Sequence, residues 1–303
     1  MKKTFWGLVL FCAVLLTVQP SVVRAETSID QTEYQVSLLE LIELLQQQIL
    51  LLQTQLAAQQ EVVELATSVI EPSVLGQQVK PIVTYQINNP AAVYDISNAE
   101  HRTYFARVFE LFPTEYDLQL KQLMVFDGLD AQFDAYVETL PPEHDSWQYA
   151  VNEDLVADYG SYLNDELVVH ELAHIISYEE MNGVPKPSVA RCDPYFDYHG
   201  CPAKNSYLGQ FVNEFWSSTD LDQAEQFTES GDPIGAAFDY YEENTDDFVS
   251  DYAAFGPEED FSESFMYFIF DKDLDGELAE EKVQFFANDK KMREVKEDIL
   301  QKL

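Results

Sequence analysis

The chain has 303 residues, of which 46% are hydrophobic and 13% are aromatic, enough apolar material for one sizeable core. It carries 55 acidic residues against 17 basic ones, a formal net charge of −38 at pH 7. A field of this sign repels nucleic acid and anionic membrane surfaces and attracts cations, which argues against nucleic-acid partners.

Residues 1–25 have the organisation of a secretory signal peptide. Lys2 and Lys3 precede an apolar run from Phe5 to Val18, and Val23-Arg24-Ala25 forms a small-x-small cleavage site. An uncleaved membrane anchor is the alternative, although this run is shorter than the ~20 residues that a spanning helix needs. We expect a secreted or extracytoplasmic protein, either released or attached to the cell surface.

Residues 34–70 show the spacing of a coiled-coil-like helix. Its a and d positions form an apolar seam: Leu38, Ile42, Leu45, Ile49, Leu52, Leu56 and Val63. Additional leucines widen this stripe beyond a dimer seam. Two alternatives therefore stay open, a homo-oligomer formed through this helix and a helix that packs on its own domain. Residues 71–80, with prolines near both ends, read as a linker.

Residues 81–303 are expected to fold as one domain of the α+β class. Strands are predicted at Pro81 to Ile87, Leu123 to Phe126 and Trp147 to Val151, where short apolar or alternating runs are bounded by turn residues. Asn98 to Leu111 has helical periodicity. Beyond Asn164 the patterns are chiefly helical, so we expect a small sheet followed by a mainly helical C-terminal half.

The strongest chemical motif is His-Glu-x-x-His at residues 170–174, within an apolar segment. A helix places residues four apart side by side, so His170 and His174 can bind one Zn²⁺ while Glu171 contacts a water on the metal. Asn164 is predicted as the N-cap of this helix and Asn182-Gly183 as its end. A buried structural histidine pair is the alternative, but it would leave polar groups in need of other partners.

A catalytic zinc ion usually has three protein ligands and one open position. Downstream, Glu259 and Glu263 lie one turn apart on a predicted amphipathic helix that contains Phe261 and Phe265. Glu259 could then bind the metal while Glu263 hydrogen-bonds a ligand histidine. From spacing alone, an ordinary acidic helix surface explains this pair equally well.

The motif at 170–174, followed at a distance by residues 252–265, resembles the gluzincin metallopeptidases, and most closely the catalytic domain of anthrax lethal factor. This resemblance implies a zincin-like fold, Glu259 as the third zinc ligand and Tyr252 as the residue that steadies the oxyanion. The implied reaction is hydrolysis of peptide bonds in a protein or peptide substrate, with Glu171 as the general base. A tyrosine packed among aromatic residues is the alternative for Tyr252.

Two further sites are suggested by short patterns. Cys192 and Cys201 flank a turn-rich segment and suit a disulfide bond, with two free thiols as the alternative. Asp271, Asp273 and Asp275, followed by Gly276, match the opening of a Ca²⁺-binding loop, but Lys282 occupies the position of its final glutamate. A solvated acidic turn between two helices is therefore favoured over a calcium site.

The leading functional hypothesis is an exported zinc-dependent metallopeptidase. The alternative is a coiled-coil surface or adhesion module whose zinc site is structural or degenerate. An open coordination position on the metal favours the enzyme, whereas a fourth protein ligand favours the adhesion module.

Overall fold

The computed structural model describes residue 48 and residues 79–127, 134–141, 145–157, 162–178, 201–228 and 230–303. The chain divides into two compact units, Met1–Ser68 and Val69–Leu303, and the second contains nearly all of the described residues. The predicted signal peptide lies outside the described residues, as does the predicted coiled-coil-like helix apart from residue 48, and both stay predictions. Among the described residues, no helix is both long enough and apolar enough to span a bilayer.

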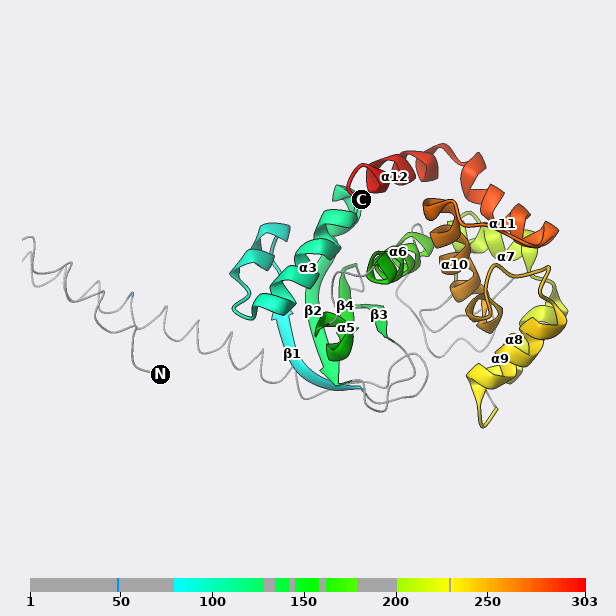
Figure 1. Cartoon of the computed structure of the whole chain (residues 1–303), viewed down its shortest axis with the longest axis horizontal. Coiled ribbons are helices and arrows are strands. Elements are labelled where there is room, and N and C mark those ends of the chain that lie inside the picture. Colours follow the sequence, from blue (N-terminus) through cyan, green and yellow to red (C-terminus); the bar gives the residue numbers. More distant parts are fainter. Residues whose placement is uncertain are drawn as a thin grey trace, which may run out of the picture. The chain divides into compact units, whose positions relative to one another are not determined.

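The second unit is a mixed α+β structure with one four-stranded sheet (Figure 1). Its strands are β1 (Lys80–Gln86), β2 (Leu120–Asp127), β3 (Ala135–Thr139) and β4 (Trp147–Asn152), in the spatial order β1-β2-β4-β3. β2 and β4 pair in parallel, and the two outer strands pair antiparallel with their neighbours. The three predicted strands are confirmed, and β1 begins at Lys80, the last residue of the predicted linker.

The edge strand β3 was not predicted from the sequence. It is only five residues long, and its segment lacks a strong apolar run. It becomes a strand by pairing antiparallel with β4, for example Val137 with Tyr149. Pairing with a neighbour satisfies backbone groups that a five-residue segment cannot satisfy alone.

The two faces of the sheet bury different side chains, because alternate residues of a strand point in opposite directions. Leu123, Val125, Tyr149 and Val151 belong to the main core, and Met124, Phe126 and Ala150 belong to a smaller cluster. Helix α3 (Ala99–Leu111) packs on the main-core face through Tyr104 and Phe105. The Tyr104 and Tyr149 hydroxyls are 3.0 Å apart. Asn98, the first residue of the predicted helical pattern, instead caps α3 by accepting hydrogen bonds from two backbone N–H groups.

The remaining elements are short connections and a set of helices. In chain order they are η2 (Pro90–Asp95), α4 (Thr114–Asp117), α5 (Glu153–Ala157), α6 (Tyr162–Ser177), α7 (Tyr207–Phe215), α8 (Ser218–Thr228), α9 (Pro233–Glu243), η3 (Tyr252–Phe255), α10 (Pro257–Phe270), α11 (Glu277–Asn288) and α12 (Lys290–Leu300). Helix α6 contacts β3 and α3 on one side and α10 on the other (Figure 1). α6 and α10 are far apart in the sequence but pack against each other, so side chains of the two helices can meet.

Helix α10 is held in place by an aromatic cluster. Phe261 and Phe265 of α10 pack edge-to-face against Phe286 of α11, and Phe211 of α7 packs against Phe261. All four rings are fully buried. Aromatic residues of this size contribute large apolar area and defined geometry, so they determine how α10 lies on its neighbours.

The boundaries of α6 differ from those predicted. The helix begins at Tyr162, so Asn164 lies inside it and cannot be its N-cap. It ends at Ser177, before Asn182-Gly183. The Ser177 hydroxyl donates to the carbonyl of His174 at 2.7 Å, a bond that occupies a backbone acceptor of the last turn.

Candidate metal centre

The first part of the site is carried by α6. His170 and His174 lie one helical turn apart, with ring centroids 4.9 Å apart and Nε2 atoms 3.2 Å apart. Around them the helix is almost wholly apolar, with Val169, Leu172 and Ala173 fully buried. The apolar residues bury this helix in the core, so the two imidazoles are held where water has little access.

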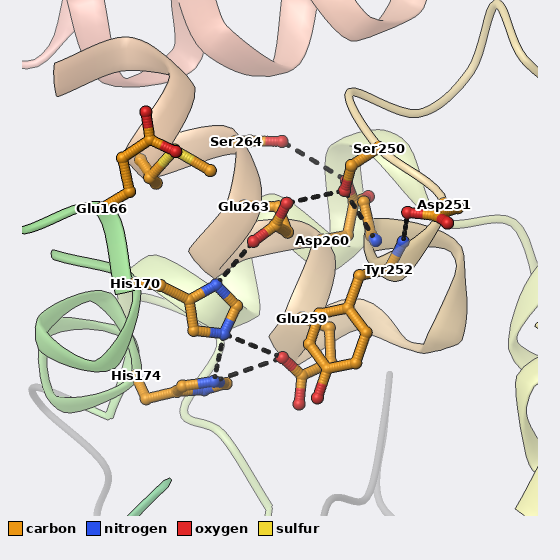
Figure 2. A network of polar contacts seen from close by, with 12 residues as sticks. Glu166, His170, His174, Ser250, Asp251, Tyr252, Glu259, Asp260, Glu263 and Ser264 are labelled. Atoms are coloured by element: carbon orange, nitrogen blue, oxygen red, sulfur yellow. Dashed lines mark hydrogen bonds and ion pairs between the residues drawn. The ribbon is translucent and has the colours of Figure 1, made fainter. Parts of the chain in front are cut away.

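The second part of the site comes from α10. Oε2 of Glu259 lies 3.1 Å from Nε2 of His170 and 3.3 Å from Nε2 of His174. Figure 2 shows both histidines facing Glu259, and His170 also facing Glu263, across the space between the two helices. The predicted ligands His170, His174 and Glu259 therefore form a group that could hold a metal ion.

The separations within this triad suit zinc. Ligand atoms that bind Zn²⁺ at ~2.0–2.1 Å in a tetrahedral arrangement lie about 3.3 Å from one another. The three measured separations are 3.1, 3.2 and 3.3 Å. Two imidazole nitrogens and one carboxylate oxygen also match a donor set that zinc accepts. Among the described residues, this group of possible ligands has three members.

Electrostatics at the triad favour positive charge. Burial alone would lower the pKa of His170, but the adjacent Glu259 and Glu263 raise it well above its ordinary value. Burial alone would raise the pKa of Glu259, but His174 and His170 bring it far below its ordinary range. The same arrangement of carboxylates that stabilises a protonated imidazole stabilises a divalent cation between these groups.

Glu263 lies within hydrogen-bonding distance of His170, which is the contact predicted for it. Its Oε1 lies 2.7 Å from Nδ1 of His170. That bond engages the nitrogen that faces away from the triad and leaves Nε2 directed toward Glu259 and His174. The other oxygen of Glu263 accepts a hydrogen bond from Ser250 at 2.7 Å. Sequence reasoning missed Ser250, because no local pattern distinguishes it from other loop serines.

Glu171, the predicted general base, is 3% exposed. Among the described residues, its Oε2 atom has no hydrogen-bond partner. Burial raises its pKa, whereas His174, His170 and a backbone hydrogen bond from Val137 of β3 act in the opposite direction. A buried carboxylate oxygen without a partner lowers the stability of the fold.

Tyr252 lies on η3, next to the triad. Its ring centroid is 5.8 Å from that of His170, and Figure 2 shows its ring beside Glu259. Its pKa is raised well above the ordinary value, mainly by burial and further by Glu259, Glu171 and Glu263. The phenol therefore keeps its proton at neutral pH and can act as a hydrogen-bond donor. Beyond Tyr252, a hollow of about 760 Å³ is lined by residues of α9 and by Asp251, Tyr252 and Phe255.

The segment with the calcium pattern is exposed and lies between two helices. Asp271, Asp273 and Asp275 are exposed between α10 and α11 and do not form a metal-binding group. Asp271 instead pairs with Lys296. Gly276 has a packing role, since a Cβ there would lie 2.3 Å from the carbonyl oxygen of Asp246.

Neither the other histidine that the structure describes nor the predicted disulfide pair belongs to this triad. His101 is buried in α3, and its Nδ1 is 2.8 Å from the hydroxyl of Tyr85. His144 and Cys192 lie outside the described residues. The predicted disulfide between Cys192 and Cys201 therefore stays a prediction. Comparison of the chain with protein-family models, with curated proteins and with solved structures finds no match.

Proposed function

We propose that this protein is an exported zinc-dependent metallopeptidase of the gluzincin type, with a zincin-like fold. One observation carries the proposal: two imidazoles from α6 and a carboxylate from α10 converge with separations of 3.1 to 3.3 Å. A buried glutamate between the two histidines has an oxygen with no partner among the described residues. The signal-like sequence of residues 1–25 supports export.

When bound at His170, His174 and Glu259, zinc would supply a Lewis acid that activates water and polarises the scissile carbonyl. Glu171 would take a proton from the attacking water and pass it to the leaving amine, a transfer for which its raised pKa is suited. Tyr252 would donate a hydrogen bond from its phenol to the developing oxyanion. Glu263 would keep the imidazole of His170 in the orientation and tautomer that a metal ligand needs.

The alternative is a coiled-coil adhesion module with a structural or degenerate zinc site. A structural zinc ion is normally enclosed by four protein ligands, and the described residues offer three. Glu171 would have no function in such a site, although its burial destabilises the fold. These two features favour the enzyme.

The test is the substitution Glu171→Gln in the purified protein, with zinc content and cleavage of fluorescent casein and of a mixed-sequence peptide library as readouts. We expect about one zinc per chain in the wild type and in the variant. Cleavage should be lost in the variant and, after chelation, restored to the wild type by added zinc. The matched control is Glu166→Gln on the same helix, whose carboxylate pairs with Lys272 at 2.9 Å.

The control variant should keep both zinc and activity. Full cleavage by Glu171→Gln would reject Glu171 as the base. A wild-type protein that binds zinc but cleaves neither substrate would favour the adhesion module. A wild type without zinc would reject the peptidase and the structural zinc site, and would leave the adhesion module with a degenerate site.

A further inference from the structure

Ser250 precedes η3 and contacts two parts of the site at once. Its hydroxyl donates to Oε2 of Glu263 at 2.7 Å and accepts from the backbone N–H of Ala253 at 3.1 Å. We propose that Ser250 is a positioning residue that couples the orientation of His170 to the placement of Tyr252. This inference rests on the proposed zinc site.

The first contact acts through Glu263. A carboxylate that is held at one oxygen can still rotate about its side-chain torsions, whereas bonds at both oxygens define its plane. Oε1 of Glu263 contacts Nδ1 of His170 at 2.7 Å, and Ser250 holds the opposite oxygen. The Glu263 side chain is 13% exposed, so little water is available to replace the serine. Loss of the hydroxyl should therefore loosen His170.

The second contact acts on the turn that carries Tyr252. The first N–H groups of any helix lack partners within the helix and need side-chain acceptors. In η3, Asp251 accepts from the N–H of Tyr252 at 2.9 Å, and Ser250 accepts from the N–H of Ala253. Asp251 is exposed to solvent, whereas Ser250 is partly buried. The serine is thus the better shielded of the two acceptors that hold this turn beside Glu259.

One hydroxyl can serve both groups because it has one donor and two acceptor sites. It lies in a chain of contacts from His170 through Glu263 to Ala253. Figure 2 shows the part of this chain from His170 to Ser250. A change in the conformation of η3 should consequently alter the orientation of His170, and a change at His170 should alter η3. A serine that only stabilised the loop would show no such coupling.

The first test is a double-mutant cycle on zinc affinity, measured by competition with a chelating dye, which needs no substrate. Ser250→Ala should weaken zinc binding about tenfold. This is the lower end of the loss in metal affinity that follows when a residue that supports a metal ligand by hydrogen bonding is removed. In a Glu263→Ala background the same substitution should cause no further loss, because the serine acts on the metal through Glu263. An equal loss in both backgrounds, or no loss in either, would overturn the proposal.

The second test is hydrogen exchange of the zinc-loaded protein at residues 252–255. Ser250→Ala should accelerate exchange there at least several-fold, and Ser250→Thr, which keeps the hydroxyl, should restore both protection and zinc affinity. The matched control is Ser206→Ala. Its hydroxyl also donates to a carbonyl and accepts from a backbone N–H, but at the start of α7.

Ser206→Ala should lower the melting temperature while leaving zinc affinity and the exchange of residues 252–255 unchanged. Unchanged exchange of this segment in Ser250→Ala would overturn the second contact. If the wild type binds zinc but cleaves no peptide, the proposed peptidase activity is rejected. The double-mutant cycle on zinc affinity still tests the role of Ser250 in that case. A wild type that binds no zinc overturns both.

Discussion

Lys282 and Asp260 form an ion pair inside the core, with Nζ and Oδ2 2.6 Å apart and side chains 2% and 0% exposed. Asp260 directly follows the candidate ligand Glu259 and also accepts a hydrogen bond from the indole of Trp216 at 2.8 Å. Lys282 donates to the carbonyl of Asp247 and lies 4.2 Å from the ring centroid of Phe248. The pair ties α10 to α11 directly behind the candidate metal centre.

Removal of the buried lysine should strongly destabilise the protein. Lys282→Met leaves the charge of Asp260 buried without its partner, which typically costs about 3–5 kcal/mol. At roughly 2–4 °C per kcal/mol for a domain of this size, the melting temperature should fall by about 10 °C. The measurement is thermal unfolding followed by circular dichroism.

Two comparisons make this measurement specific to the buried pair. Lys290→Met breaks the exposed pair with Glu294 and should leave the melting temperature unchanged. Adding Asp260→Asn to Lys282→Met removes the uncompensated charge and should recover part of the loss. A Lys282→Met protein as stable as the wild type would show that the pair does not matter to the fold.

Glu259→Gln should reduce zinc binding by at least about tenfold. The amide is a much poorer zinc ligand than the carboxylate, and the negative charge between the two histidines is lost. The neighbouring Glu258→Gln removes the same charge from the same helix turn at a residue outside the triad. Zinc content by mass spectrometry should separate the two variants, and retention of zinc by Glu259→Gln would exclude this residue as the third ligand.

Tyr252→Phe should keep zinc and lose turnover. Removal of one donor to an oxyanion usually lowers kcat by about 10²–10³, and the phenylalanine ring preserves the packing of Tyr252 against Phe255. Tyr94→Phe, at a ring that is 68% exposed, is the control. Steady-state kinetics on a cleaved peptide would reveal the effect in kcat rather than KM. Equal kcat values for the two variants would show that Tyr252 serves packing and does not stabilise the oxyanion.

Asp117→Asn should stabilise the protein at neutral pH and not at low pH. Burial raises the pKa of Asp117 above 3.8, and its Oδ1 has no hydrogen-bond partner among the described residues. Because the folded pKa is raised, the ionised carboxylate destabilises the fold above that pKa, and the cost disappears as the pH falls toward 3.8. The gain is limited by the charges of Lys302 and Lys121, which favour the ionised form of Asp117.

Urea unfolding of the Asp117→Asn protein between pH 7 and pH 4 checks this dependence. The stability difference from the wild type should shrink steadily as the pH falls. Asp222→Asn, at an exposed aspartate of α8, should show no comparable trend. A gain that grows toward low pH would reverse the sign and refute the assignment.

Local sequence determined the features that depend on neighbouring residues. The spacing of His170 and His174 alone places two imidazoles on one helix face, because residues four apart are adjacent on any α-helix. The strand at Trp147 and the helix that follows Asn98 were predicted correctly for similar local reasons. Where local signals compete the prediction was wrong, as for Asn164, which lies inside α6.

The tertiary structure decided what depends on segments far apart in the chain. Glu259 and an ordinary acidic surface residue were indistinguishable by spacing, and only the packing of α10 through Phe261 and Phe265 brings Glu259 to the histidines. Ser250 and the edge strand β3 had no local signal, because each acquires its role from a partner in another segment. Sequence periodicity records which face of an element is buried, but not which distant side chain it will meet.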